Sequence, residues 1–65
     1  MNRFFVNPAD IHQNEVRFSK DHSHQIRRVL RLKEGDRVEV LDDSGTVFQV
    51  RVTPRAEGEH VIGEV

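Results

Sequence analysis

The sequence contains no cysteine, no tryptophan and no tyrosine, and it has only two prolines. Without cysteine, the chain can form neither a disulfide nor a thiolate metal site. No apolar run approaches the ~18 residues that a membrane span requires, and the opening stretch MNRFFVNPADIH lacks the apolar core of a signal peptide. These absences favour a cytoplasmic protein without a membrane partner, in a reducing compartment.

The length of 65 residues allows one small domain, spanning residues 1–65. A chain of this size buries only ~60% of the surface that it exposes when unfolded. We therefore expect support from a second domain or from an oligomer. The apolar pattern continues to Val65, which favours an N-terminal module of a longer protein.

Charge is distributed unevenly, although the net charge is only −1. Residues 1–33 hold seven lysines and arginines against three carboxylates, whereas residues 34–65 hold three against eight. Such asymmetry predicts a basic face, with chance variation in a short chain as the alternative.

Alternation of apolar and polar residues predicts a mainly β domain with one short helix. Strands are expected at 3–6, 15–19, 37–40, 48–53 and 60–65, with turns at 42–45 and 54–58. Phe18 and Phe48 fall on apolar faces and are expected in the core, while the adjacent Phe4 and Phe5 must face opposite sides. A small antiparallel barrel is the expected closure because it removes exposed edges.

The helix is expected over residues 20–31, capped by Ser19 or Asp21 and followed by a tight connection at Gly35. Steps of 100° per residue divide its side chains into two stripes. The inward stripe is predicted to hold His22, Ile26, Val29 and Leu30. The outward stripe is predicted to hold His24, Arg27, Arg28 and Arg31.

Sequence motifs for catalysis are absent, with no Gly-rich phosphate loop and no Gly-x-Ser-x-Gly, so we assign no catalytic residue. We also predict no metal site. His22 and His24 are separated by ~200° on a helix and cannot share one ion. His12 and His60 fall in an expected loop and strand.

The outward arginines are the best candidates for a binding function. Guanidinium groups stay charged and bind phosphate oxygens in bidentate fashion, and each neutralised phosphate adds affinity through counterion release. A solvated helix face and a contact with a protein partner remain as alternatives. The candidate nucleic-acid-binding residues on this basis are Arg27, Arg28 and Arg31, with Arg17, Lys20 and Lys33 nearby.

The chain resembles the N-terminal domain of the RsmE-type ribosomal RNA methyltransferases along essentially its whole length. The resemblance rests on RFFV at the start, on QIRRVLRLKEGD over residues 25–36, and on VEVLDDSG after it. It implies an RNA-contact role for Arg28 and Arg31, and it matches Arg3 to a basic residue near the start of the family. With Arg3 and His24 included, the candidate RNA-binding residues are Arg27, Arg28, Arg31, Arg3, Arg17, Lys20, His24 and Lys33. Family members often have histidine directly before the aliphatic residue at position 26, where this chain has Gln25.

The resemblance also implies a PUA-like β-barrel that helps to bind 16S ribosomal RNA or the small ribosomal subunit. The parent enzyme would methylate N3 of a uridine. Its S-adenosylmethionine site, its catalytic residues and its dimer contacts would lie in a C-terminal SPOUT methyltransferase domain outside these 65 residues. The segment itself is expected to hold no cofactor. The alternative is a structural module that packs on the catalytic domain or across the homodimer without touching RNA.

Overall fold

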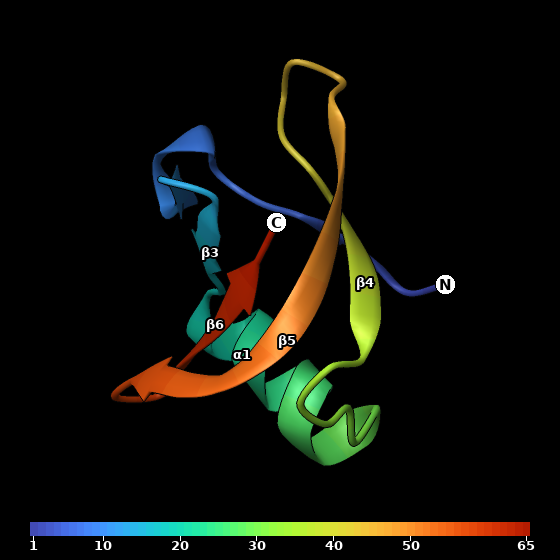
Figure 1. The fold of residues 1–65 in the computed structure, drawn as a ribbon, viewed down its shortest axis with the longest axis vertical. Helices are drawn as coiled ribbons and strands as arrows, with labels where there is room; N and C mark the ends of the chain where they lie inside the picture. The colour runs from blue at the N-terminus through green and yellow to red at the C-terminus, as the bar shows by residue number, and fades with distance from the viewer.

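A single curled sheet of six strands organises the chain in the computed structural model, which describes residues 1–65 (Figure 1). The strands follow the order β1-β4-β5-β6-β3-β2 across the sheet. None of the helices has the length and apolar character needed to cross a lipid bilayer. The strands are β1 (Arg3–Phe5), β2 (Ile11–His12), β3 (Glu15–Arg17), β4 (Arg37–Leu41), β5 (Val47–Glu57) and β6 (His60–Glu64). The helical segments are a 3-10 turn (Pro8–Asp10), α1 (Lys20–His24) and a π-helical segment (Gln25–Val29).

The prediction of a mainly β, PUA-like fold with one short helix is confirmed. Four of the five strand pairs are antiparallel, and β1 pairs in parallel with β4. The expected closure of the barrel is incomplete, because β1 and β2 lie at the two edges and do not pair with each other, so the curled sheet forms a half-barrel. Figure 1 shows the curl most clearly in β5, which bends along its length.

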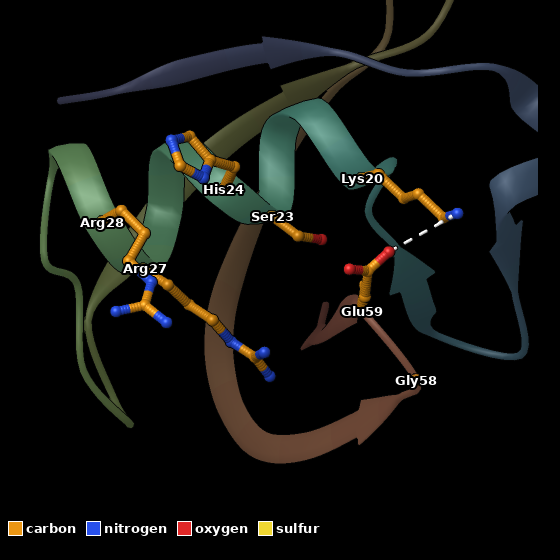
Figure 2. A pocket seen from close by; sticks show the side chains of 7 residues that line it. All are labelled: Lys20, Ser23, His24, Arg27, Arg28, Gly58 and Glu59. Carbon is orange, nitrogen blue, oxygen red and sulfur yellow. Dashed lines mark ion pairs between the residues drawn. The ribbon is translucent and has the colours of Figure 1, made fainter.

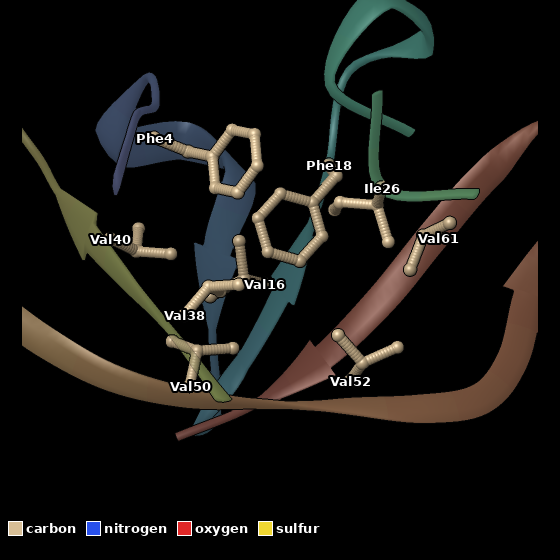
Figure 3. Close-up of a cluster of buried hydrophobic side chains, with 9 residues drawn as sticks. All are labelled: Phe4, Val16, Phe18, Ile26, Val38, Val40, Val50, Val52 and Val61. Carbon is tan, nitrogen blue, oxygen red and sulfur yellow. The ribbon is translucent and has the colours of Figure 1, made fainter. Parts of the chain in front are cut away.

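The core lies on the concave face of the sheet, where the helix covers it. The Phe4 and Phe18 rings meet edge to face at its centre, with centroids 5.7 Å apart. Phe48, on β5, packs against this core and is half-buried. Phe4 is buried and Phe5 is 71% exposed, as expected for adjacent residues on one strand. Figure 3 shows the nine buried members: Phe4, Val16, Phe18, Ile26, Val38, Val40, Val50, Val52 and Val61.

The helix begins as the sequence predicts. Ser19 is the N-cap, and its side-chain oxygen accepts a hydrogen bond from the His22 N–H at 3.1 Å. After His24 the hydrogen bonds widen to a π-helical pattern, in which the Leu30 N–H donates to the Gln25 carbonyl at 2.7 Å. The helical conformation ends at Val29, before the predicted end at Arg31.

The predicted inward stripe is wrong at its C-terminal end. Ile26 is fully buried and His22 is half-buried, but Val29 is 66% exposed and Leu30 is 38% exposed. A turn closed by i→i+5 hydrogen bonds holds more residues than an α-helical turn. Steps of 100° therefore do not apply after Gln25, and these two apolar side chains face outward.

The predicted turn at 54–58 is also wrong, because β5 continues to Glu57. The register between β5 and β6 is irregular between Val52 and Ala56, and Pro54 falls within this irregular stretch. Proline has no N–H to donate and is tolerated in a strand at such places. The chain turns instead at Gly58 and Glu59, since Glu57 already pairs with His60.

Candidate nucleic-acid interface

A cationic surface is formed where the helix ends. Arg27 and Arg28 project from the π-helical segment, and Arg31 and Lys33 follow in the connection to β4. All four side chains are exposed, and none of them forms an ion pair. We call these four residues the arginine surface.

The local backbone explains how Arg31 reaches this surface. Its φ of 53° is left-handed, a conformation that usually ends a helix at glycine or asparagine. The Leu32 N–H donates to the Ile26 carbonyl at 2.8 Å and closes the helix end around Arg31. Arg31 is therefore not a member of the helical stripe to which the sequence assigned it, but it still lies beside Arg27 and Arg28.

The connection to β4 is fixed by a second short turn. Asp36 caps it, because its carboxylate accepts a hydrogen bond from the Lys33 N–H at 2.7 Å. Gly35 has a φ of +90°, and its N–H donates to the Val52 carbonyl at 2.8 Å. The predicted tight connection at Gly35 is confirmed, and it anchors Lys33 close to β5.

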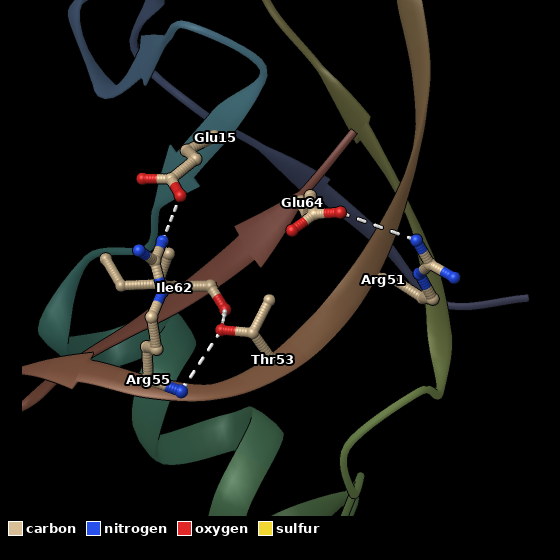
Figure 4. A network of polar contacts seen from close by, with 6 residues as sticks. All are labelled: Glu15, Arg51, Thr53, Arg55, Ile62 and Glu64. Carbon is tan, nitrogen blue, oxygen red and sulfur yellow. Dashed lines mark hydrogen bonds and ion pairs between the residues drawn. The ribbon is translucent and has the colours of Figure 1, made fainter.

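Most other cations of the chain are neutralised by carboxylates. Arg3 pairs with Glu39 at 2.7 Å, and this hydrogen bond lowers the pKa of Glu39. The remaining pairs are Arg17 with Glu57 at 3.2 Å, Lys20 with Glu59 and Arg51 with Glu64, both at 3.5 Å, and Arg55 with Glu15. Figure 4 shows the last two of these pairs beside the Thr53 hydroxyl, which donates to the Ile62 carbonyl at 2.7 Å.

Two shallow depressions flank the arginine surface. The first, of about 310 Å³, lies between the helix and the β5–β6 turn (Figure 2). Its lining residues are Lys20, Ser23, His24, Arg27, Arg28, Gly58 and Glu59. The second, of about 400 Å³, is lined by Arg27, Arg28, Arg31, Leu32 and Lys33.

Arg27 and Arg28 line both depressions, so one continuous cationic track runs past the end of the helix. Six of the eight candidate residues thus come together: Lys20, His24, Arg27, Arg28, Arg31 and Lys33. The other two do not. Arg3 lies on the β1 strand at one edge of the sheet, and Arg17 lies on β3 and pairs with Glu57.

Ser23 has a structural role that sequence reasoning missed. It is 1% exposed, and its hydroxyl accepts a hydrogen bond from the Val61 N–H at 2.8 Å. The same hydroxyl donates to the Phe18 carbonyl at 3.4 Å. These bonds hold the helix against β6 and so position the arginine surface. No sequence pattern could have indicated this, because Val61 lies far along the chain from Ser23.

The chemistry available at this surface is recognition of anions. No group of three or more histidine, cysteine, aspartate or glutamate side chains is placed to hold a metal ion. The track presents guanidinium, ammonium and imidazole groups in open depressions, with one carboxylate, Glu59, at one end. Such a surface suits a chain of phosphates better than a small ligand, which prefers a concave and mostly apolar pocket.

The curled sheet with a single covering helix defines a small half-barrel of the PUA type. The chain belongs to the RNA methyltransferase PUA domain family, whose model matches residues 19–64. The matched range includes the whole arginine surface. Membership implies an RNA-binding role for the domain.

Comparison with solved structures supports the fold. A chain described as "Crystal structure of an hypothetical protein" superposes with a TM-score of 0.81 at 18% sequence identity. The match covers 98% of the present chain but only 27% of that chain. No curated protein matches the sequence.

Proposed function

We propose that this domain binds RNA through the arginine surface and presents it to a methyltransferase domain elsewhere in the same parent protein. The observation that carries the proposal is the distribution of ion pairs. Five of the ten lysines and arginines have no carboxylate partner, and four of these five are the arginine surface; the fifth is Arg37 on β4. Unpaired cations on one face are available to neutralise phosphates.

The parent is proposed to be an RsmE-type enzyme that methylates N3 of a uridine in 16S ribosomal RNA with S-adenosylmethionine. The support is the family membership together with the resemblance of RFFV and VLRLKEGD to that enzyme type. In this proposal the small ribosomal subunit is the partner and the cytoplasm is the location. A C-terminal SPOUT domain would supply the cofactor site and the dimer contacts.

The expected binding is weak and sensitive to salt. Three to six phosphate contacts on single-stranded RNA correspond to a log–log salt slope of about −2 to −4, since each contact contributes about −0.7. The depressions hold no phenylalanine, tyrosine or tryptophan, and the His24 imidazole is the single ring on which a base could stack. Affinity should therefore come from the RNA backbone, with little preference for sequence.

The competing function is a packing module that does not touch RNA. The observation that favours it is the exposure of Val29 and Leu30 beside the arginines, because exposed apolar side chains that gather together often mark a protein contact. In that case the arginines would pair with carboxylates of the partner domain. Deleting residues 1–65 from the parent would then abolish its dimers rather than its affinity for RNA.

Titration of a fluorescent single-stranded fragment of ribosomal RNA at several salt concentrations tests the proposal. The variant Arg28→Ala with Arg31→Ala should bind more weakly and lose about 1.4 from the salt slope, equal to two phosphate contacts. The matched control is Arg51→Ala with Arg55→Ala, which removes two exposed arginines that already have carboxylate partners. Affinity that ignores salt, or that falls equally in the two variants, would contradict the proposal.

A further inference from the structure

Glu59 is the only carboxylate that lines the two depressions beside the arginine surface. It belongs to the two-residue connection between β5 and β6, where Glu57 pairs with His60. Gly58 has a φ of +59°, which matches the preference of such hairpin turns for glycine at the first central position. The turn therefore fixes where the Glu59 backbone lies, at the edge of the first depression.

The partner of Glu59 is Lys20, at the start of the helix. The Lys20 Nζ and a Glu59 carboxylate oxygen are 3.5 Å apart, and the two side chains are 69% and 77% exposed. An ion pair with that much solvent contact contributes little to folding stability. Figure 2 shows Glu59 reaching from the turn toward Lys20, on the far side of the depression from Arg28. The negative charge of Glu59 therefore has more effect on an anion that enters the depression than on folding stability.

We propose that Glu59 is a specificity-determining residue that sets the end of the RNA-binding track. Its carboxylate neutralises Lys20 and repels phosphates from the hairpin side. The RNA backbone is thereby directed along Arg27 and Arg28 toward Arg31 and Lys33. This inference rests on the proposed RNA-binding function and adds to it a boundary at which the bound RNA backbone stops.

The structure gives a quantitative expectation. Replacing Glu59 with glutamine frees Lys20 to make one additional phosphate contact. One contact on single-stranded RNA contributes about −0.7 to the log–log salt slope, which corresponds to about fivefold tighter binding near 0.1 M salt. Lys20→Gln introduced into the Glu59→Gln protein should cancel this gain, because the added contact is made by Lys20.

Glu64→Gln is the matched control. Glu64 is also an exposed glutamate whose partner, Arg51, lies 3.5 Å away, but it does not line either depression of the arginine surface. Both single variants change the net charge by the same amount. Any difference between them therefore reports the position of Glu59 and not the total charge of the protein.

The experiment measures binding of a fluorescent oligouridylate to the wild-type protein, the two single variants, the Lys20→Gln/Glu59→Gln protein and the Arg28→Ala/Arg31→Ala protein, with circular dichroism to confirm folding. Tighter binding and a steeper slope for Glu59→Gln than for Glu64→Gln, lost in the double variant, would support the inference. Equal affinities of the two single variants, with wild-type binding still dependent on Arg28 and Arg31, would overturn this inference alone. A wild-type protein whose binding ignores Arg28 and Arg31 would instead overturn the proposed function.

Discussion

Replacing Gly63 with alanine should destabilise the domain, although it adds only one methyl group. Gly63 is buried on β6, and an added Cβ would lie 2.9 Å from Phe18 Cε2 and still closer to Val50 Cγ1. Both neighbours belong to the core and are at most 1% exposed, so neither can move aside freely. The added atom therefore overpacks the centre of the sheet.

The size of the effect follows from two opposing contributions. Overpacking a core costs about 1–3 kcal/mol, and contacts this short favour the upper end. Gly63 is not in a left-handed conformation, so alanine also stabilises the fold by about 0.4–1 kcal/mol through the unfolded state. The net loss in free energy of unfolding is about 2 kcal/mol, equivalent to roughly 8–16 °C in Tm for a domain of this size.

Thermal and urea unfolding followed by circular dichroism would measure this loss. Val50→Ala removes the nearest obstructing methyl group, so Gly63→Ala should cost less in a Val50→Ala background than in the wild type. A coupling energy of at least about 0.5 kcal/mol between the two changes is expected for residues in contact. The reasoning is refuted if Gly63→Ala unfolds within about 0.5 kcal/mol of the wild type, or if the two effects simply add.

Two further predictions concern the attachment of the helix and the edge of the sheet. Ser23→Ala leaves the buried Val61 N–H without its acceptor and should cost about 1–3 kcal/mol in urea unfolding. Ser44→Ala should cost less, because the Ser44 hydroxyl bonds Asp42 and Thr46 in an exposed turn where water can replace it. Arg3→Gln should raise the pKa of Glu39 toward its ordinary value in an NMR pH titration, because the Arg3 hydrogen bond is the main cause of the lowered pKa. A carboxyl group whose pKa is lowered in the folded state stabilises the fold at pH values above its ordinary pKa, and this contribution is lost as the pH falls through the lowered pKa. The variant should therefore be less stable than the wild type at neutral pH and equally stable in strong acid. An unchanged pKa of Glu39 would show that the Arg3 hydrogen bond does not lower it.

Local chemistry in the sequence was sufficient to predict most of the strands and the start of the helix. Val38 and Val40, like Val50 and Val52, alternate with polar residues and all four are buried. Ser19 is a good helix cap wherever it precedes a helical segment. The alternation of buried residues and the helix cap both depend on residues close in the sequence, so the sequence alone predicts their positions.

Features that depend on distant parts of the chain could not be predicted. The π-helical hydrogen bonds leave Val29 and Leu30 exposed. The helix propensities of these residues do not distinguish a π-helical segment from an α-helix. The parallel pairing of β1 with β4 and the hydrogen bond from Val61 to Ser23 join segments far apart in sequence. The tight approach at Gly63 is likewise a consequence of how the sheet curls over Phe18.

The sequence indicated which residues gather at the candidate site better than it indicated how their side chains are arranged. The sequence grouped the arginines on a helical stripe, but Arg31 lies beyond the helix in a left-handed conformation. It also could not separate paired from unpaired cations, because the partners of Arg3, Arg17 and Lys20 come from β4, β5 and the β5–β6 turn. Whether these candidate residues contact RNA remains a prediction.

Mapping the RNA contact by NMR tests the central claim most directly, because it reports which face of the molecule is used. Backbone amide and arginine side-chain signals would be followed as single-stranded ribosomal RNA is added to labelled protein. We predict that the largest shifts will occur between His24 and Lys33 and will shrink as salt is raised. Shifts centred on Arg51 and Arg55 of β5, with residues 24–33 unmoved, would contradict the account.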